Sequence, residues 1–251
     1  MPVEPPATVP ATEAFGVGSM NIPAAAGQGG DLSRANTRAC LSAAAAQVGL
    51  LGTQETSEPE DNEDIDTVLP PADWYHFQAV SECDILVKRN RWAPVLDASG
   101  SPVTHRIQLS TGTAHVTPER DLTDVQLTWT DRPDWTPFAF GDSHFVSGVD
   151  SGLSPVDVRK KDRDLEMAGL VKWAQAQYDA GRNVIFVADT NWLHMPLPHP
   201  EWQWVVNGSI DKVGILNSPG SNWVLSFVSE ESYASPSDHR FRVCNLLATA
   251  R

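Results

Sequence analysis

The segment 183–192, NVIFVADTNW, has the clearest pattern of hydrophobic and polar positions in the chain. Its residues 184–188 are all apolar, and most are β-branched or aromatic, which predicts a strand buried on both faces. Because side chains alternate along an extended segment, Asp189 and Asn191 are expected to point the same way where the strand ends. The alternative is an ordinary polar turn, since Asp and Asn are common turn residues.

Further runs of apolar, β-branched or aromatic residues predict strands along the whole chain. The expected strands are 15–22, 48–54, 74–79, 83–88, 92–96, 104–109, 125–129, 138–146, 202–206, 210–216, 223–228 and 241–247. Helices are expected over 31–47 and 155–180, and the second lies between two strands, as a crossover connection does. The acidic stretch 56–66 is interpreted as a solvated loop.

Residues 1–14 contain four prolines and no periodicity, which predicts a disordered leader in front of one domain over 15–251. Many strands and few helices, spread over the whole length, indicate a single α/β domain. Two packed sheets with flanking helices are the expected arrangement.

The composition limits the function. A formal net charge of −14 repels nucleic acid as a whole, so a nuclease of this composition needs a locally basic rim or bound cations. Cys40, Cys83 and Cys244 lack metal-ligand spacing, which predicts buried free thiols and a reduced, cytoplasmic location. Neither a signal peptide nor a run of about 20 apolar residues is recognised, so no membrane partner is expected.

Polar residues stand where several predicted strands begin or end. They are Asn21, Glu55, His144, Asp189, Asn191, Asp211, Asp238 and His239. Each alone is ordinary, but their coincidence indicates a site. Mg²⁺ prefers oxygen ligands, which Glu55, Asp238 and the Asn21 amide supply, and histidines can move protons or bind a phosphoryl oxygen. Neither Cys–His nor Ser–His–Asp chemistry fits, since the cysteines have no nearby partner and G-x-S-x-G is missing.

The order of the short motifs is more specific than any one of them. SMN (19–21), GTQE (52–55), SH (143–144), ADTN (188–191), ID (210–211) and SDHR (237–240) together resemble the endonuclease/exonuclease/phosphatase superfamily, the deoxyribonuclease I-like proteins. The resemblance covers 15–247 and implies a four-layered α/β sandwich, with two mixed β-sheets face to face and helices outside. ADTN departs from the usual GDFN, but Ala188 and Thr190 are both compatible with a strand end.

The resemblance also implies roles for the metal and water. Glu55 would bind the metal, with Asn21 near the metal and phosphate and Asp238 as a second metal or water contact. Asp189 would orient or deprotonate the attacking water, and Asn191 would hold the phosphate.

For the histidines, the resemblance implies that His239 meets the scissile phosphate and that Asp211 pairs with it and selects its tautomer. His144 is similar to the histidine of deoxyribonuclease I and the sphingomyelinase-like enzymes. Glu82 resembles the glutamate that supports that histidine, and the alternative is a carboxylate on a strand edge.

The implied activity is divalent-metal-dependent cleavage of DNA phosphodiester bonds by in-line attack of an activated water. Mg²⁺ is the expected cofactor, with Mn²⁺ or Ca²⁺ as alternatives. The expected partner is a nucleic acid, DNA in preference to RNA, and a monomer without an obligate protein partner is expected. Two alternatives stay open: a phosphatase or phosphodiesterase for small or lipid phosphoesters such as inositol phosphate or sphingomyelin, and a catalytically silent binding module.

Four arginines are candidates for substrate contact: Arg34, Arg38, Arg89 and Arg240. The first two lie one helical turn apart, Arg89 belongs to a small basic cluster, and Arg240 follows the second histidine motif. The alternative for all four is a solvated surface charge. Replacing Asp189 or His239 by alanine is expected to remove activity with little loss of stability, on the premise that cleft residues are exposed.

Overall fold

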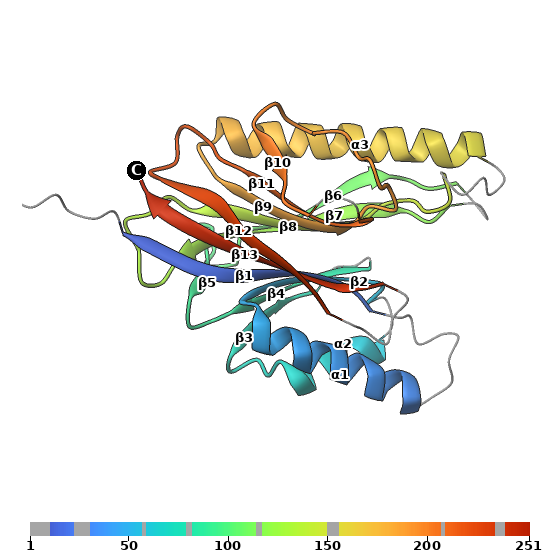
Figure 1. Cartoon of the computed structure of the whole chain (residues 1–251), viewed down its shortest axis with the longest axis horizontal. Coiled ribbons are helices and arrows are strands. Elements are labelled where there is room, and N and C mark those ends of the chain that lie inside the picture. Colours follow the sequence, from blue (N-terminus) through green and yellow to red (C-terminus); the bar gives the residue numbers. More distant parts are fainter. Residues whose placement is uncertain are drawn as a thin grey trace, which may run out of the picture.

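The computed structural model describes residues 11–22, 31–56, 59–78, 82–113, 117–149, 156–206, 209–233 and 239–251. Two mixed β-sheets pack face to face (Figure 1). Helices α1 (Asp31–Gln47) and α2 (Pro59–Val68) cover the outer face of one sheet, and α3 (Val156–Asp179) covers the outer face of the other. The predicted four-layered α/β sandwich is confirmed.

The first sheet contains the N-terminal and C-terminal strands. Its members are β1 (Thr12–Asn21), β2 (Leu50–Gln54), β3 (Trp74–Phe77), β4 (Cys83–Lys88), β12 (Trp223–Tyr233) and β13 (Phe241–Ala250). They are arranged in the order β12-β13-β1-β2-β4-β3. Strands β1 and β2 are parallel, and the other pairs are antiparallel.

The second sheet is built from the middle of the chain. Its members are β5 (Trp92–Pro94), β6 (Thr104–Ser110), β7 (Arg120–Trp129), β8 (Phe138–His144), β9 (Val184–Asp189), β10 (Trp202–Trp204) and β11 (Asp211–Leu216). They are arranged in the order β10-β11-β9-β8-β7-β5, and β6 pairs with β7. Helix α3 connects the parallel strands β8 and β9, as the crossover prediction requires.

Aromatic rings fill one end of the space between the sheets. The Trp129 ring lies 5.3–6.1 Å, centroid to centroid, from the rings of Phe15, Trp92, Trp135, Phe138 and Trp223. Aromatic side chains of this size bury a large apolar area and stabilise the contact between the sheets. Trp129 ends β7, so this cluster lies at the opposite end of that strand from Arg120.

At the other end, the inward faces of the strands change from apolar to polar. Ile185 and Val187 of β9 belong to the core between the sheets, and Asp189 is the next side chain on the same face. On β1, Val17 belongs to the same core and Asn21 occupies the last position on its face. The strand period therefore places polar groups at one mouth of an otherwise apolar interior.

The acidic stretch after β2 is a helix and not the solvated loop that its charge suggested. Asp64 of α2 is buried and forms ion pairs with Arg34 and Arg38 of α1, at N–O distances of 2.8 and 2.7 Å. Burial by itself would raise the pKa of Asp64, but the hydrogen bonds from the two arginines lower it overall. Pairing between the two helices, rather than local charge, thus decides the structure of this segment.

Several strands are longer than predicted. β1 begins at Thr12, three residues before the expected start, and β7 begins at Arg120, five residues before. Residues 1–10 of the expected leader lie outside the described residues. All three cysteines are free and buried, as predicted. Within the described parts, no helix combines the length and apolar character needed to cross a bilayer.

Candidate active site

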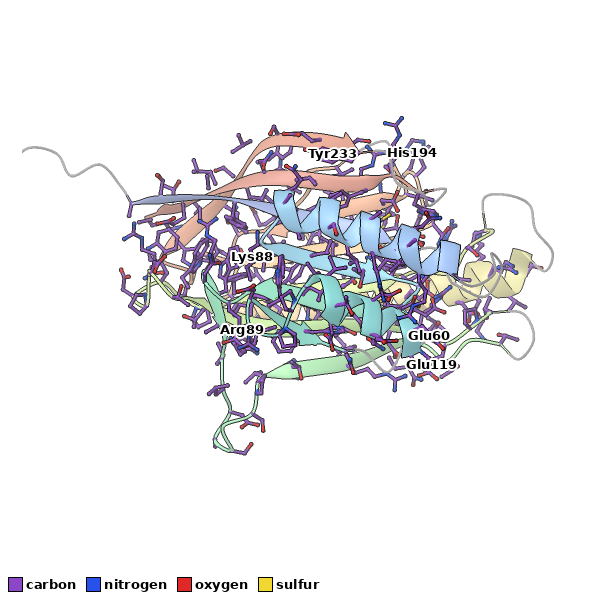
Figure 2. The ribbon with its side chains drawn as sticks, turned by 90° about the horizontal axis from the view of Figure 1, so that it is seen from below. Glu60, Lys88, Arg89, Glu119, His194 and Tyr233 are labelled. Carbon is purple, nitrogen blue, oxygen red and sulfur yellow. The ribbon has the colours of Figure 1, made fainter. Side chains whose placement is uncertain are left out.

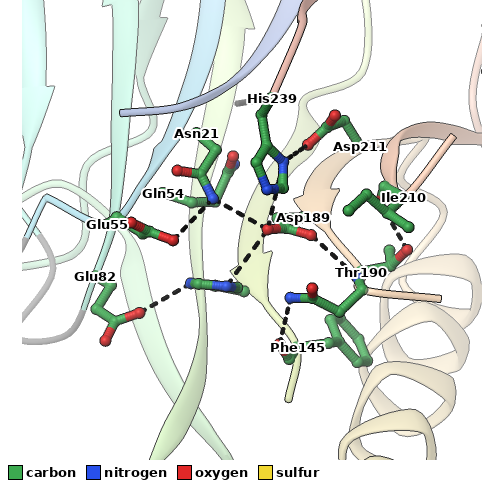
Figure 3. Close-up of polar contacts among 12 residues, drawn as sticks. Asn21, Gln54, Glu55, Glu82, Phe145, Asp189, Thr190, Ile210, Asp211 and His239 are labelled. Atoms are coloured by element: carbon green, nitrogen blue, oxygen red, sulfur yellow. Dashed lines mark hydrogen bonds and ion pairs between the residues drawn. The ribbon is translucent and has the colours of Figure 1, made fainter. Parts of the chain in front are cut away.

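The polar mouth is assembled by strand register (Figure 3). In the first sheet, Asn21 pairs with Gln54 across the parallel strands β1 and β2. In the second sheet, Asp189 lies between His144 on parallel β8 and Asp211 on antiparallel β11. Parallel strands that end together, beside antiparallel strands that begin there, bring these side chains to one edge of the sandwich.

Asn21 connects the two sheets at this mouth. Its Nδ2 donates to Glu55 Oε1 at 3.1 Å and to Asp189 Oδ2 at 3.0 Å. Glu55 follows β2 with a φ of 64°, in the left-handed region that non-glycine residues rarely adopt. Backbone strain of this kind costs on the order of 1–3 kcal/mol and occurs preferentially at functional sites.

His239 lies against two carboxylates. Its Nδ1 donates to Asp211 Oδ1 at 2.8 Å, which selects the tautomer protonated on Nδ1, and lies 3.7 Å from Asp189 Oδ2. A neutral imidazole of this tautomer carries its lone pair on Nε2. The structure therefore brings His239, Asp211 and Asp189 together, as the motif order led us to expect.

His144 occupies the other side of Asp189. Its Nε2 lies 3.4 Å from Asp189 Oδ2, and its Nδ1 lies 2.9 Å from Glu82 Oε2. The Arg120 guanidinium donates to the same Glu82 oxygen. Burial by itself would raise the pKa of Glu82, but the hydrogen bond from His144 and the positive charge of Arg120 lower it to about 2. Glu82 therefore stays ionised and holds His144 in place.

Asp189 is only 1% exposed. Burial raises its pKa, and the nearby charges of His144 and His239 offset only part of that shift. The premise that cleft residues are exposed is therefore wrong for Asp189, and the stability of its alanine variant stays a prediction. Because the folded state keeps a costly buried carboxylate, a neutral side chain of the same shape relieves that cost.

Asn191 is held by backbone contacts beside Asp189. Its backbone N–H donates to Asp189 Oδ1 at 3.0 Å, and its side-chain Nδ2 donates to the Phe145 carbonyl at 3.0 Å. One of its two amide protons is therefore engaged within the protein. The residue has a φ of 47°, which asparagine tolerates better than most residues, and it lines the pocket.

These groups surround a pocket of about 340 Å³. Its lining is Glu55, Glu82, Arg120, His144, Ser147, Asp189, Asn191 and His239. The half-buried Glu55 carboxylate fits Mg²⁺, which takes one or two carboxylates and keeps several waters. Asn21 uses its nitrogen toward Glu55 and Asp189, so its amide oxygen is the atom suited to a cation. A second group, Asp189, Asp211 and His239, has ligand atoms within 4.8 Å of one another.

Arg120 is a site residue that the sequence did not reveal. It is buried and lines the pocket, with Nη1 3.0 Å from His144 Nδ1. Arg120 lay before the strand predicted over 125–129, in a stretch without apolar periodicity. Only the greater length of β7 brings it to the mouth of the sandwich.

Asp142 is a second buried polar residue near the site that the sequence analysis did not identify. It lies on the same face of β8 as His144 and is fully buried, and it accepts a hydrogen bond from Gln54 Nε2 at 2.6 Å. Burial raises its pKa well above the ordinary value for aspartate. The two-residue spacing from His144 is the signal that would have placed it on this face.

The four arginines expected to contact substrate are placed elsewhere. In the described part of the chain, none of Arg34, Arg38, Arg89 and Arg240 lines the pocket. Arg34 and Arg38 have carboxylate partners on α2. Asp238, expected as a metal or water contact, lies outside the described residues.

Arg89 and Arg240 also have other contacts. The Arg89 guanidinium lies 3.7 Å from the centre of the Tyr75 ring, and Figure 2 shows Arg89 well separated from Glu119, the neighbour of pocket residue Arg120. Arg240 is exposed and donates to Ser232 Oγ at 3.1 Å. Of the arginines that the structure describes, Arg120 is the one on the pocket wall.

Glu166 of α3 supports the pocket wall from behind. Its carboxylate accepts hydrogen bonds from Ser110 Oγ at 3.1 Å and from the backbone N–H of Val146, two residues after His144, at 2.9 Å. Burial raises its pKa from 4.5 to about 7, although both hydrogen bonds favour the ionised form. The side chain is therefore a titratable group near neutral pH.

We expect Glu166 to make folding stability fall as pH rises from about 4.5 to about 7. In that window the folded state retains a proton that the unfolded state releases, so stability falls with pH, by roughly 3 kcal/mol in total at 1.36 kcal/mol per unit. Urea unfolding of wild type and Glu166→Gln at several pH values measures this, with the exposed Glu60→Gln as control. Parallel pH profiles for wild type and Glu166→Gln would contradict it.

Comparison with known proteins identifies the fold. No protein-family model matches the chain, and no curated protein matches it. An endonuclease/exonuclease/phosphatase family protein from Bacteroides thetaiotaomicron superposes with a TM-score of 0.65 at 15% identity, over 94% of this chain and 98% of that one.

Two further solved structures are similar over nearly their whole length. TDP2 of D. rerio, complexed with a single-strand DNA product, has a TM-score of 0.63 at 12% identity, over 93% of this chain and 98% of that one. A mannosyl-6-phosphatase of Bacteroides thetaiotaomicron has a TM-score of 0.64 at 16% identity, over 92% and 99%. The resemblance drawn from the motifs is thus confirmed as a shared fold.

Proposed function

We propose that this chain, which has the fold of endonuclease/exonuclease/phosphatase proteins, is a divalent-metal-dependent phosphoester hydrolase that cleaves phosphodiester bonds, with DNA as the first substrate. The observation that carries this proposal is the arrangement around Asp189. Its Oδ2 lies 3.0 Å from Asn21 Nδ2, 3.4 Å from His144 Nε2 and 3.7 Å from His239 Nδ1. A base with two imidazoles beside it suits attack by water and protonation of a leaving group.

Asp189 is the proposed base. Burial raises its pKa above the ordinary aspartate value, which makes the carboxylate a better proton acceptor than an exposed one. Its Oδ1 is held by the Asn191 backbone N–H. A water hydrogen-bonded to this fixed carboxylate is oriented for in-line attack on a phosphorus atom in the pocket.

The two imidazoles and Arg120 are the proposed groups for the phosphoryl oxygens and the leaving group. Asp211 orients His239 through Nδ1, and Nε2 is the atom that we assign to the phosphate. When the imidazole is protonated, its Nε2–H can give a proton to the leaving oxygen. Arg120, held by Glu82 beside His144, adds a fixed positive charge to the pocket wall. Charges positioned before the reaction stabilise the charge that develops in the transition state.

Glu55 and Asn21 are the residues we propose for Mg²⁺, and Mn²⁺ or Ca²⁺ are alternatives. A bound divalent cation supplies Lewis-acid polarisation of a phosphoryl oxygen. The strained φ of 64° at Glu55 supports this assignment, because it directs a carboxylate toward the pocket from a non-glycine position that is otherwise disfavoured.

A second candidate function is hydrolysis of small phosphoesters. In the described chain, the four arginines expected to contact a long polyanion do not line the 340 Å³ pocket, and the net charge is −14. Both features support a compact substrate as the second candidate. Proteins of similar fold include TDP2 in complex with a single-strand DNA product and a mannosyl-6-phosphatase.

Supercoiled plasmid incubated with Mg²⁺, Mn²⁺ or Ca²⁺, and with EDTA, tests the nuclease proposal. Nicking that requires a divalent ion is the expected result. If the plasmid stays intact and phosphate is released from an inositol phosphate or a sugar phosphate, the second candidate function is supported and DNA is not the substrate. No hydrolysis of any substrate, with no metal binding, would overturn both and leave a catalytically silent binding module.

A further inference from the structure

Residues of α3, β6 and β7 line a groove of about 600 Å³. Figure 1 shows α3 over the outer side of the second sheet. The groove extends along α3 from Gly169 to Gln177 and reaches Arg182 after the helix. In the part of the chain that the structure describes, the groove and the pocket around Asp189 share no lining residue. The groove is therefore a separate concavity, within the size range of small-molecule sites.

The charge in this groove is opposite to that of the whole chain. Four basic side chains line it, His105, Arg106, Lys172 and Arg182, against one acid, Asp124. Without counting His105, three side chains with a positive charge line the groove against one carboxylate, in a chain of net charge −14. Such a local reversal favours an anionic ligand.

Two of these cations are better placed for a ligand than the others. Arg106 is engaged by carboxylates, since its guanidinium lies 2.7 Å from Asp121. Among the described residues, the Arg182 side chain donates from Nε to the neutral Oε1 of Gln177, at 2.7 Å, which orients the guanidinium without neutralising its charge. Lys172 is exposed on α3. Lys172 and Arg182 are therefore the positive charges available to a phosphate or carboxylate.

Other groups of the groove are held in fixed orientations. The Asp124 carboxylate accepts from His105 Nδ1 at 2.7 Å and from Trp173 Nε1 at 2.7 Å, so one buried acid orients an imidazole and an indole. His105 remains half-exposed, so its other nitrogen is available to a ligand. A preformed site of this kind lowers the ordering cost of binding.

The remaining lining suits a flat ring. Ile107 and Ala176 contribute accessible apolar surface, and Gln108 and Gln126 contribute amides that both donate and accept hydrogen bonds. A ligand that matches these features carries an anion at one end and a planar, hydrogen-bonding ring at the other.

We propose that the groove between α3 and strands β6 and β7 binds a small organic phosphate of the mononucleotide class. Lys172 and Arg182 contact the phosphate, and the ring lies on the apolar surface of Ile107 and Ala176 within reach of the glutamine amides. The groove is separate from the pocket around Asp189. The molecule bound in the groove is therefore a ligand that is not hydrolysed there.

Titration calorimetry with AMP in the presence of EDTA tests this, with thermal unfolding as a second readout. Wild type should bind one AMP saturably and gain thermal stability with ligand concentration. Lys172→Glu should weaken AMP binding by about tenfold or more, because it replaces a charge-assisted contact by repulsion. The exposed Lys160→Glu, about three turns earlier on α3, is the matched control and should bind as wild type.

Inorganic phosphate and adenosine, titrated separately, show which part of AMP is recognised, and each should bind more weakly than AMP. His239→Ala should retain AMP binding. Three results would overturn the proposal: no saturable binding at millimolar AMP, equal weakening by Lys160→Glu and Lys172→Glu, or loss of binding in His239→Ala with retention in Lys172→Glu.

Discussion

Asp189→Asn should lower kcat/KM for phosphoester hydrolysis by about 10²- to 10⁴-fold, the contribution of a positioned general base. Asparagine keeps the size of the side chain but cannot accept the proton from water. A steady-state assay on the substrate identified by the hydrolysis experiments measures the loss.

The same substitution should leave the Tm at pH 7 nearly unchanged. Burial raises the pKa of Asp189, so the ionised carboxylate costs the folded state free energy at every pH above its folded pKa. Removing that charge stabilises the folded state, and this gain offsets the weaker hydrogen bond that the new amide accepts from Asn21. The two effects oppose each other, whereas the catalytic loss has no compensation.

Asp164→Asn is the matched control, because it makes the same change of charge at an exposed position on α3. It should leave both kcat/KM and Tm as in wild type. If Asp189→Asn keeps near wild-type activity, Asp189 is not the base. If its Tm falls as far as that of a core truncation, the residue is mainly structural.

Glu55→Gln should raise the Mg²⁺ concentration required for half-maximal activity by at least 10- to 100-fold, the range typical of groups that merely orient metal ligands. The amide has the same shape but lacks the negative charge that a hard cation prefers. A Mg²⁺ titration of the rate measures this, and direct Mg²⁺ binding by calorimetry separates loss of metal from loss of chemistry.

Glu60→Gln serves as control for Glu55→Gln, since Glu60 is exposed at the start of α2. It should leave the Mg²⁺ requirement unchanged. A Glu55 variant with wild-type Mg²⁺ affinity but a reduced rate would assign the metal to other carboxylates, among them the group of Asp189, Asp211 and His239.

Local patterns in the sequence predict much of this molecule. The apolar run before Asp189 predicts a buried strand, and β9 is buried at every position. Likewise the expected helix over 31–47 coincides with α1. Such predictions succeed because strand and helix periods depend on neighbouring residues, and burial of one face follows from them.

The prediction for the acidic stretch 56–66 failed because it depended on distant partners. The charge of the acidic stretch after β2 predicts a solvated loop. In the structure the stretch is a helix whose Asp64 pairs with Arg34 and Arg38. The same pairing gives those two arginines carboxylate partners within the protein. The sequence shows how many charged side chains a segment contains. It does not show which oppositely charged side chains contact that segment in the folded protein.

The sequence by itself determined which polar residues stand at strand ends, because alternation along a strand is a local property that each segment carries. Only the tertiary structure decided that Asn21 joins Glu55 to Asp189 across two sheets, and that Arg120 reaches Glu82 and His144. Those contacts depend on how the two sheets are stacked and on how far β7 extends. Both are set by the packing of the whole core, which no single segment encodes.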